Sequence, residues 1–245
     1  MNASASPGFA EPSPEDQLRF LLRLYFGPGD DLLGLCVHRA YLDFSRTLHG
    51  IGKHPHAVQK ASRYLHKELS HIAASGDCSS ETGFDAWHKK TCVGLCDIYV
   101  SEGFTSFHMG QAQKWINMAL KYVYVIGESR LPDYAAMYGY CHVPIDNILL
   151  AQPDFARLRR FKQAWSRVDN YDEYMEFQRA VRREFEGSSP LAVEFVLWQA
   201  GKSASPRADI SSTAPARRMA RCRDLSPATP RDSPVPALET RPAHR

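Results

Sequence analysis

Apolar residues recur at helical spacing along most of the chain. Leu18, Leu21 and Tyr25 fall on one face of a helix expected over residues 17–25. A serine, a proline and two acids directly precede it, which is a typical helix start. The same period predicts further helices, the last ended by Gly201, and a short helix that begins near residue 144 and stops near residue 153. The further helices are expected over residues 32–48, 55–74, 83–100, 111–126, 155–166, 171–186 and 190–199.

Strand signals are almost absent from the sequence. The β-branched run at residues 123–126 continues the period of the helix that contains it, and we assign it to that helix. No internal repeat of about 20 to 50 residues is present. We therefore expect an all-α fold, with one domain of about eight to ten helices over residues 15–201.

Both ends of the chain differ in composition from this helical region. Residues 1–14 are rich in Ala, Ser, Pro and Gly, while residues 202–245 hold nine Lys and Arg, four Asp and Glu and seven Pro, but no aromatic residue. Such compositions are typical of disordered segments, and we predict disorder at both ends. The formal charge of +3 arises from the second segment, because residues 1–201 carry a net charge of −2.

Several classes of protein are excluded by this composition. No apolar run approaches the roughly 20 residues of a membrane-spanning helix, and the first residues lack the basic and apolar regions of a secretory signal. The six cysteines form no regular framework. Cys92 and Cys96 would share a helix face, but no further ligands complete a metal site, which favours small apolar side chains in a reduced core. We expect a cytoplasmic protein without membrane anchor, metal or cofactor.

Three blocks in the second half of the chain contain candidate chemistry: GQAQKWINMALKY, CHVPIDNILL and SSPLAVEFVLWQAG. Taken singly, each has an ordinary structural interpretation. Lys114 and Lys121 are seven residues apart, as on a solvated helix face. A proline followed by Asp146 is typical of a helix start, and Trp198 at the end of an apolar run fits a core position.

In combination, the three blocks resemble the helix-hairpin-helix DNA glycosylases, and among them the archaeal type of 8-oxoguanine DNA glycosylase. A QK pair opens a long apolar helix, a PID follows in which Asp146 comes 32 residues after Lys114, and LW-x-AG closes the region. These features occur in that family's order and spacing. The resemblance covers residues 105–201.

The resemblance implies a pair of catalytic residues. Lys114 would attack the sugar C1′ of the damaged nucleotide, expel the base and form a Schiff base, and Asp146 would assist it. An amine attacks only when it is neutral, so a catalytic lysine needs partial desolvation. A nearby carboxylate can take a proton from the amine or stabilise the cationic sugar that develops as the base leaves.

The resemblance also implies residues that bind the flipped nucleotide and the DNA backbone. Trp198 would stack on the base, and Glu194 would read its polar edge, since a flipped base presents both a π-face and a polar edge. Met118 stands where the archaeal proteins have an aromatic residue and would cover the other face of the base. The hairpin before the lysine would contact a DNA phosphate, here through Gly110, Gln111 and Gln113.

The expected function is removal of an oxidised purine such as 8-oxoguanine from DNA by base flipping, with or without strand cleavage. The expected partner is double-stranded DNA with a damaged base, bound by a monomer that is nucleoid-associated when on DNA. Two alternatives stay open: a catalytically inactive nucleic-acid binder with the same fold, and a helical protein-interaction module. Binding by a region of net charge −2 requires local basic clusters. Candidate clusters are Lys53, Lys60, Arg63 and Lys67; His88, Lys89 and Lys90; Arg157, Arg159 and Arg160; and Arg217, Arg218, Arg221 and Arg223.

Overall fold

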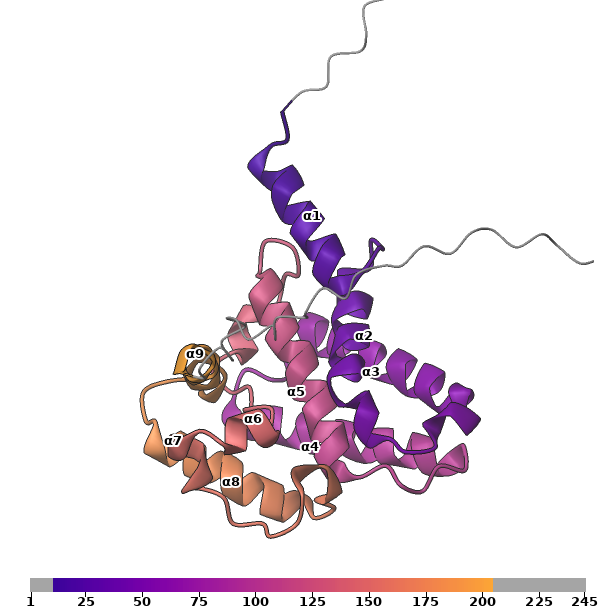
Figure 1. Ribbon diagram of the computed structural model, residues 1–245, viewed down its shortest axis with the longest axis vertical. Helices are drawn as coiled ribbons and strands as arrows, with labels where there is room; N and C mark the ends of the chain where they lie inside the picture. Colours follow the sequence, from indigo (N-terminus) through magenta and orange to yellow (C-terminus); the bar gives the residue numbers. More distant parts are fainter. Residues whose placement is uncertain (1–10, 205–245) are drawn as a thin grey trace, which may run out of the picture. The chain divides into compact units, whose positions relative to one another are not determined.

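The computed structural model describes the backbone of residues 11–204 and the side chains of residues 11–199. Within this part, the chain forms nine α-helices, four short 3-10 helices and no strand (Figure 1), which confirms the expected all-α fold. The helices are α1 (Pro14–Phe26), α2 (Leu32–Phe44), α3 (Pro55–Ser75), α4 (Glu81–Ser101), α5 (Met109–Ile126), α6 (Asn147–Leu150), α7 (Pro153–Ala156), α8 (Tyr171–Glu184) and α9 (Pro190–Ala204), with the 3-10 turns η1 (Ser45–Thr47), η2 (Ile51–Lys53), η3 (Ala135–Met137) and η4 (Trp165–Arg167).

The end segments expected to be disordered fall largely outside the described residues. Residues 1–10 and 205–245 are not described, and with them Cys222 and the arginine cluster at residues 217–223. Helix α1 begins at Pro14, three residues before the expected start, and Ser13 is its N-cap residue.

Helix α5 runs through the middle of the fold, with α2 and α4 packed along it (Figure 1). Residues 110–123 are all buried, so buried side chains occupy its whole circumference. Trp115 is fully buried against the rings of Tyr41 and Phe44, and its Nε1 donates to the carbonyl oxygen of Val37 at 2.9 Å. The apolar period predicts one buried face. The structure also buries the other faces, through polar side chains that have partners inside the fold.

Side-chain caps explain where several helices begin. The Ser13 hydroxyl accepts a hydrogen bond from the Asp16 amide, and the Asp16 carboxylate accepts from the Ser13 amide, which forms a capping box at the start of α1. Ser80 caps α4 in a similar way, through the Gly83 amide. Asp146 caps α6, where its Oδ1 accepts from the Leu149 amide at 2.7 Å.

Two helix predictions are wrong. A helix over residues 155–166 is absent: α7 ends at Ala156, and the chain is irregular until η4. The Arg159 guanidinium donates to the carbonyl oxygens of Phe161 and Gln163. In a helix, these carbonyl oxygens would accept from backbone amides instead. Gly201 does not end α9, which continues to Ala204. A glycine inside a helix costs only about 1 kcal/mol relative to alanine, so a helix can continue through it.

Candidate functional site

Lys114 and Asp146 form a close ion pair. The Lys114 Nζ donates to Asp146 Oδ2 at 2.6 Å, and Lys114 is only 4% exposed. Lys114 projects from α5, whereas Asp146 stands at the first turn of α6, where its other oxygen caps that helix. The helix cap fixes the orientation of the carboxylate, so the lysine faces a preorganised partner.

A second ion pair lies about two helical turns further along α5. The Lys121 Nζ donates to both carboxylate oxygens of Glu194 on α9, at 2.9 and 2.6 Å, and Glu194 is 3% exposed. Burial raises the pKa of Glu194, although the ammonium of Lys121 acts in the opposite direction. The Lys121 ammonium also lies 5.1 Å from the centroid of the Trp198 ring and 5.8 Å from that of Phe195. Aromatic faces thus contribute to holding this cation in place.

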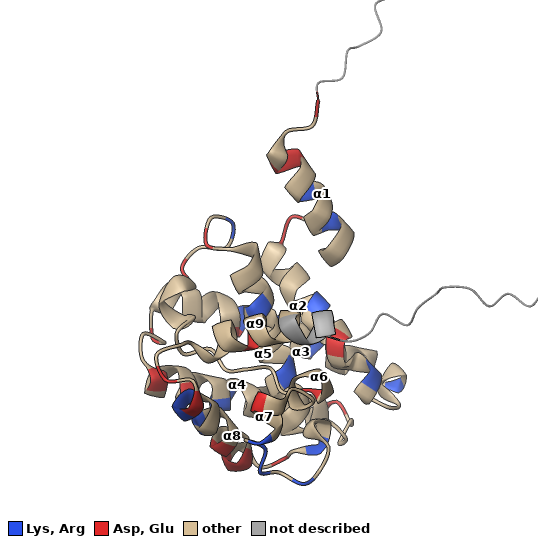
Figure 2. Cartoon of the chain, turned by 60° about the vertical axis from the view of Figure 1, so that its left-hand side comes forward, with Lys and Arg blue, Asp and Glu red and all other residues tan. Residues whose placement is uncertain are grey.

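Both ion pairs open into one cavity of about 720 Å³. The structure brings together in its lining all five residues expected to catalyse or to bind a base: Lys114, Asp146, Trp198, Glu194 and Met118. Lys and Arg positions lie close to Asp and Glu positions where α2, α5 and α9 approach one another (Figure 2). The volume lies within the range of about 300 to 1,000 Å³ typical of pockets for small molecules.

Another part of the cavity lining comes from α1, α2 and η1, a region without any motif of the family that the sequence resembles. Arg39, Asp43 and Arg46 line it, together with Tyr25 of α1 and Tyr122 of α5. The Tyr122 hydroxyl donates to Asp43 Oδ2 at 2.5 Å, and the Arg39 guanidinium lies 4.5 Å from the centroid of the Tyr25 ring. The spacing of Arg39, Asp43 and Arg46 places them on one helix face, a signal that the sequence contains.

The residues expected to contact the DNA backbone are used inside the fold instead. The Gly110 amide donates to the Val168 carbonyl at 2.7 Å, and a Cβ on Gly110 would lie 1.8 Å from the Trp165 carbonyl oxygen. Gln111 is fully buried and donates to the Thr47 hydroxyl at 2.9 Å. Gln113, 1% exposed, binds backbone groups of the core. These positions correct the expectation that the three residues face a phosphate.

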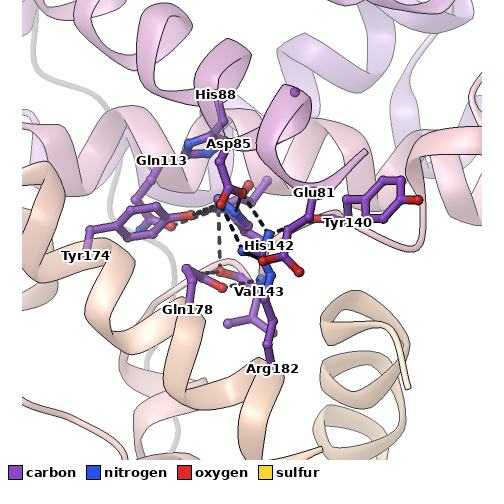
Figure 3. Close-up of polar contacts among 12 residues, drawn as sticks. Glu81, Asp85, His88, Gln113, Tyr140, His142, Val143, Tyr174, Gln178 and Arg182 are labelled. Carbon is purple, nitrogen blue, oxygen red and sulfur yellow. Dashed lines mark hydrogen bonds and ion pairs between the residues drawn. The ribbon is translucent and has the colours of Figure 1, made fainter. Parts of the chain in front are cut away.

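Two glutamines hold the segment that leads to Asp146. Gln178 of α8 accepts from the Val143 amide at 3.1 Å and donates to the Val143 carbonyl at 2.9 Å. Gln113 of α5 accepts from the Ile145 amide at 3.2 Å and donates to the Ile145 carbonyl at 3.1 Å. We call this arrangement of Gln113, Gln178, Val143 and Ile145 the amide clamp; Figure 3 shows part of it. Because Gln113 precedes Lys114 directly, the clamp ties both members of the ion pair to the same turn of α5.

A buried polar cluster, which we call the histidine network, adjoins the clamp (Figure 3). It consists of Asp85, His88, His142, Tyr174 and Arg182. The Arg182 guanidinium donates to both oxygens of Asp85 at 2.9 and 2.8 Å, and His142 Nε2 lies 2.8 Å from the same carboxylate. The Tyr174 hydroxyl lies 2.7 Å from His142 Nδ1. A neutral His142 with its proton on Nε2 satisfies both contacts.

Burial controls the charge of both histidines in the network. It lowers the pKa of His142 to about 4 and that of His88 well below its ordinary value. Burial alone would raise the pKa of Asp85, but hydrogen bonds from Arg182 and His142 outweigh it and lower this pKa. At neutral pH the network therefore contains two neutral imidazoles beside one compensated ion pair.

The basic clusters expected from sequence are partly neutralised. Lys60 pairs with Glu102, and the Arg157 guanidinium lies 2.6 Å from Glu184. His88 belongs to the core. Lys89 lies 3.9 Å from Asp172 in an exposed pair, which exerts little net attraction on a distant ligand.

The cysteines in the described part of the chain are free thiols, and burial raises the pKa of Cys96 to about 12. Within residues 11–204, no three His, Cys, Asp or Glu residues form a group that could hold a metal ion. No helix in that range has both the length and the apolar character required to cross a membrane.

Comparison of the chain with protein-family models, with curated proteins and with solved structures gives no match.

Proposed function

We propose that the protein is a DNA glycosylase that removes an oxidised purine through Lys114. The observation that carries the proposal is the Lys114–Asp146 pair, 2.6 Å apart in a cavity that Trp198 also lines. Sequence spacing alone leaves open that Lys114 is a solvated surface residue; its exposure of 4% excludes that interpretation.

The pair supplies the proton transfer that the chemistry requires. Movement of one proton from the Lys114 ammonium to the Asp146 carboxylate leaves a neutral amine. The amine attacks C1′ of the flipped nucleotide, the bond between C1′ and the base breaks, and the base leaves with the electron pair. The base then takes the proton from Asp146, which restores the carboxylate. The C1′–O4′ bond of the sugar ring then breaks, O4′ takes one proton from the attached nitrogen, and the adduct becomes a protonated Schiff base.

The remaining lining supports recognition of a purine. Trp198 offers a π-face, and Met118 offers a polarizable thioether that packs well against aromatic rings. Guanine oxidised at C8 carries a proton on N7, for which the Glu194 carboxylate is an acceptor, while the Lys121 ammonium can donate to carbonyl oxygens of the base. The helix-hairpin-helix glycosylase fold and an accompanying lyase activity belong to the same proposal.

Borohydride trapping tests this function. A duplex that contains 8-oxoguanine is expected to form a covalent complex with the wild-type protein after reduction, because borohydride reduces the Schiff base to a stable amine. The variant Lys114→Gln is expected to give none. Lys162→Gln is the matched control, since it removes an exposed lysine outside the cavity lining and retains the nucleophile. Trapping that survives Lys114→Gln, or no trapping by the wild type, would overturn the proposed chemistry.

A further inference from the structure

The charges that line the cavity do not balance. Four cationic side chains face three carboxylates in its lining: Arg39, Arg46, Lys114 and Lys121 against Asp43, Asp146 and Glu194. Two of the carboxylates are already taken, because Asp146 pairs with Lys114 and Glu194 pairs with Lys121. The surplus positive charge therefore lies on the wall that α2 and η1 form.

On that wall, both arginines lack an acid within ion-pair distance among the described residues. Asp43 lies between them in sequence and attracts Arg39, but its hydrogen bond comes from the Tyr122 hydroxyl. Arg46 is exposed at the cavity. Arg39 is half-buried, and its Nε is a buried donor with no acceptor among the described residues. A buried donor without an acceptor costs free energy, and no acceptor in the described part of the chain offsets this cost for Arg39.

The shape of this wall favours a particular kind of anion. The Arg39 guanidinium carbon lies 4.5 Å from the centroid of the Tyr25 ring, and both residues line the cavity. A guanidinium is planar and presents a fork of N–H donors that matches the oxygens of a phosphate. One phosphodiester carries a single negative charge, which equals the surplus of four cations over three carboxylates.

We propose that Arg39 and Arg46 bind one phosphodiester of the DNA strand, beside the nucleotide whose base enters the cavity. This inference rests on the proposed function, and it assigns the backbone contact to α2 and η1 instead of the start of α5. Gly110, Gln111 and Gln113 already form hydrogen bonds inside the fold. A DNA strand that reaches Lys114 is therefore held by Arg39 and Arg46 of the cavity lining.

The salt dependence of DNA binding tests the assignment without any chemical step. The probe is a duplex with a stable abasic-site analogue, and its affinity is measured by fluorescence anisotropy over a series of salt concentrations. Arg46→Gln and Arg39→Gln are each expected to weaken binding about tenfold and to lower the slope of log Kd against log salt by about 1. Arg46→Lys keeps the charge but not the fork, and it is expected to retain the slope while losing part of the affinity.

Arg183→Gln is the matched control, because Arg183 is an exposed arginine of α8, outside the cavity lining. It is expected to leave both affinity and slope near their wild-type values. Slopes of Arg46→Gln and Arg39→Gln equal to that of the control, with trapping through Lys114 intact, would overturn this inference alone. Lowered slopes in a protein that never forms the trapped complex would uphold the phosphate site and overturn the proposed chemistry. Equal affinity for inorganic phosphate and for the duplex would overturn the assignment to a DNA backbone.

Discussion

The histidine network and the cavity use similar chemical groups in opposite ways. Each joins carboxylates to cations at distances between 2.6 and 2.9 Å. In the network, His142 is fully buried against the rings of Phe84 and His88, while the Asp85 and Arg182 side chains that pair beside it are 24% and 12% exposed and line no part of the cavity. Around Lys114 and Lys121, a volume of about 720 Å³ is left open. The comparison shows that an acid–base pair becomes a candidate for chemistry through the space beside it, not through its own geometry.

The two regions are connected through α5. Asn117 donates to the Tyr174 hydroxyl at 2.9 Å and to Gln113 at 3.1 Å, so hydrogen bonds run without interruption from the histidine network to the amide clamp. The clamp in turn holds the segment that ends at Asp146. These hydrogen bonds thus connect the histidine network to the segment that positions Asp146 beside the cavity.

A fall in pH is expected to destabilise the fold through the histidine network and to stabilise it through Glu194 in the cavity. This pH dependence of the free energy of unfolding is the largest effect that we expect. The folded state lowers the pKa of His142 from 6.5 to about 4, so unfolded chains bind the proton more tightly, and stability falls as pH drops between these values. This histidine alone accounts for a loss of about 3 kcal/mol, and the lowered pKa of His88 adds to it. Glu194 has a raised pKa, so protonation near and above pH 4.5 favours its folded state.

Chemical denaturation at a series of pH values between about 4 and 7 measures this dependence. His142→Gln is expected to flatten the slope, and Glu194→Gln to steepen it. His71→Gln, at an exposed position of α3, serves as control and leaves the slope as it is. An unchanged slope in His142→Gln would contradict the role given to burial.

Removal of Asp85 breaks the histidine network directly. Asp85→Ala leaves His142 Nε2 without its acceptor and leaves Arg182 with Glu81, at 3.1 Å, in place of two acids, and we expect a loss of about 2–3 kcal/mol in the free energy of unfolding. The comparison variant is Asp172→Ala, which removes an acid whose side chain is 79% exposed and is expected to cost under about 0.5 kcal/mol. Similar losses for the two variants in urea denaturation would show that the network does not stabilise the fold.

Removal of Lys121 tests the open region and is expected to have the smallest effect. Lys121→Met leaves the Glu194 carboxylate buried without its cation, but the cavity beside it has room for water that can solvate the charge, and we expect a loss of about 1–2 kcal/mol. The double variant Lys121→Met/Glu194→Gln is expected to recover most of this loss, because no unpaired charge remains. Denaturation of the wild type, both single variants and the double variant completes the cycle. Additive losses would indicate that the two side chains are not coupled.

Sequence patterns predict the elements of this fold better than its contacts. The period of residues 111–126 gives α5, and the spacing of Lys114 and Lys121 gives their shared face. The histidine network lies beyond such reasoning, because Asp85 is 57 residues from His142 and 97 from Arg182, and no local pattern links them. The missing helix at residues 155–166 has the same origin. Its apolar spacing fits a helix, but the irregular segment packs on α8, where the Phe161 ring contacts that of Phe177 and Gln163 Nε2 donates to Glu173 at 2.9 Å.

The assignment of Gly110 failed for a related reason. Its position before Lys114 fits a flexible hairpin, but the structure uses the missing side chain to let Trp165 approach the start of α5. The cavity residues Arg39 and Arg46 show the converse. Their spacing in the sequence places them on one helix face, but only the packing of α2 against α5 brings that face to the cavity.

The amide clamp depends on only part of the sequence spacing between Lys114 and Asp146. This spacing of 32 positions includes the turn at residues 127–133, which takes no part in the clamp. The short stretch from Val143 to Asp146 does enter it, since two side-chain amides on different helices fix its register. Chains with a longer or shorter turn can therefore preserve the same ion pair, while a single insertion after Val143 would detach the carboxylate from its lysine.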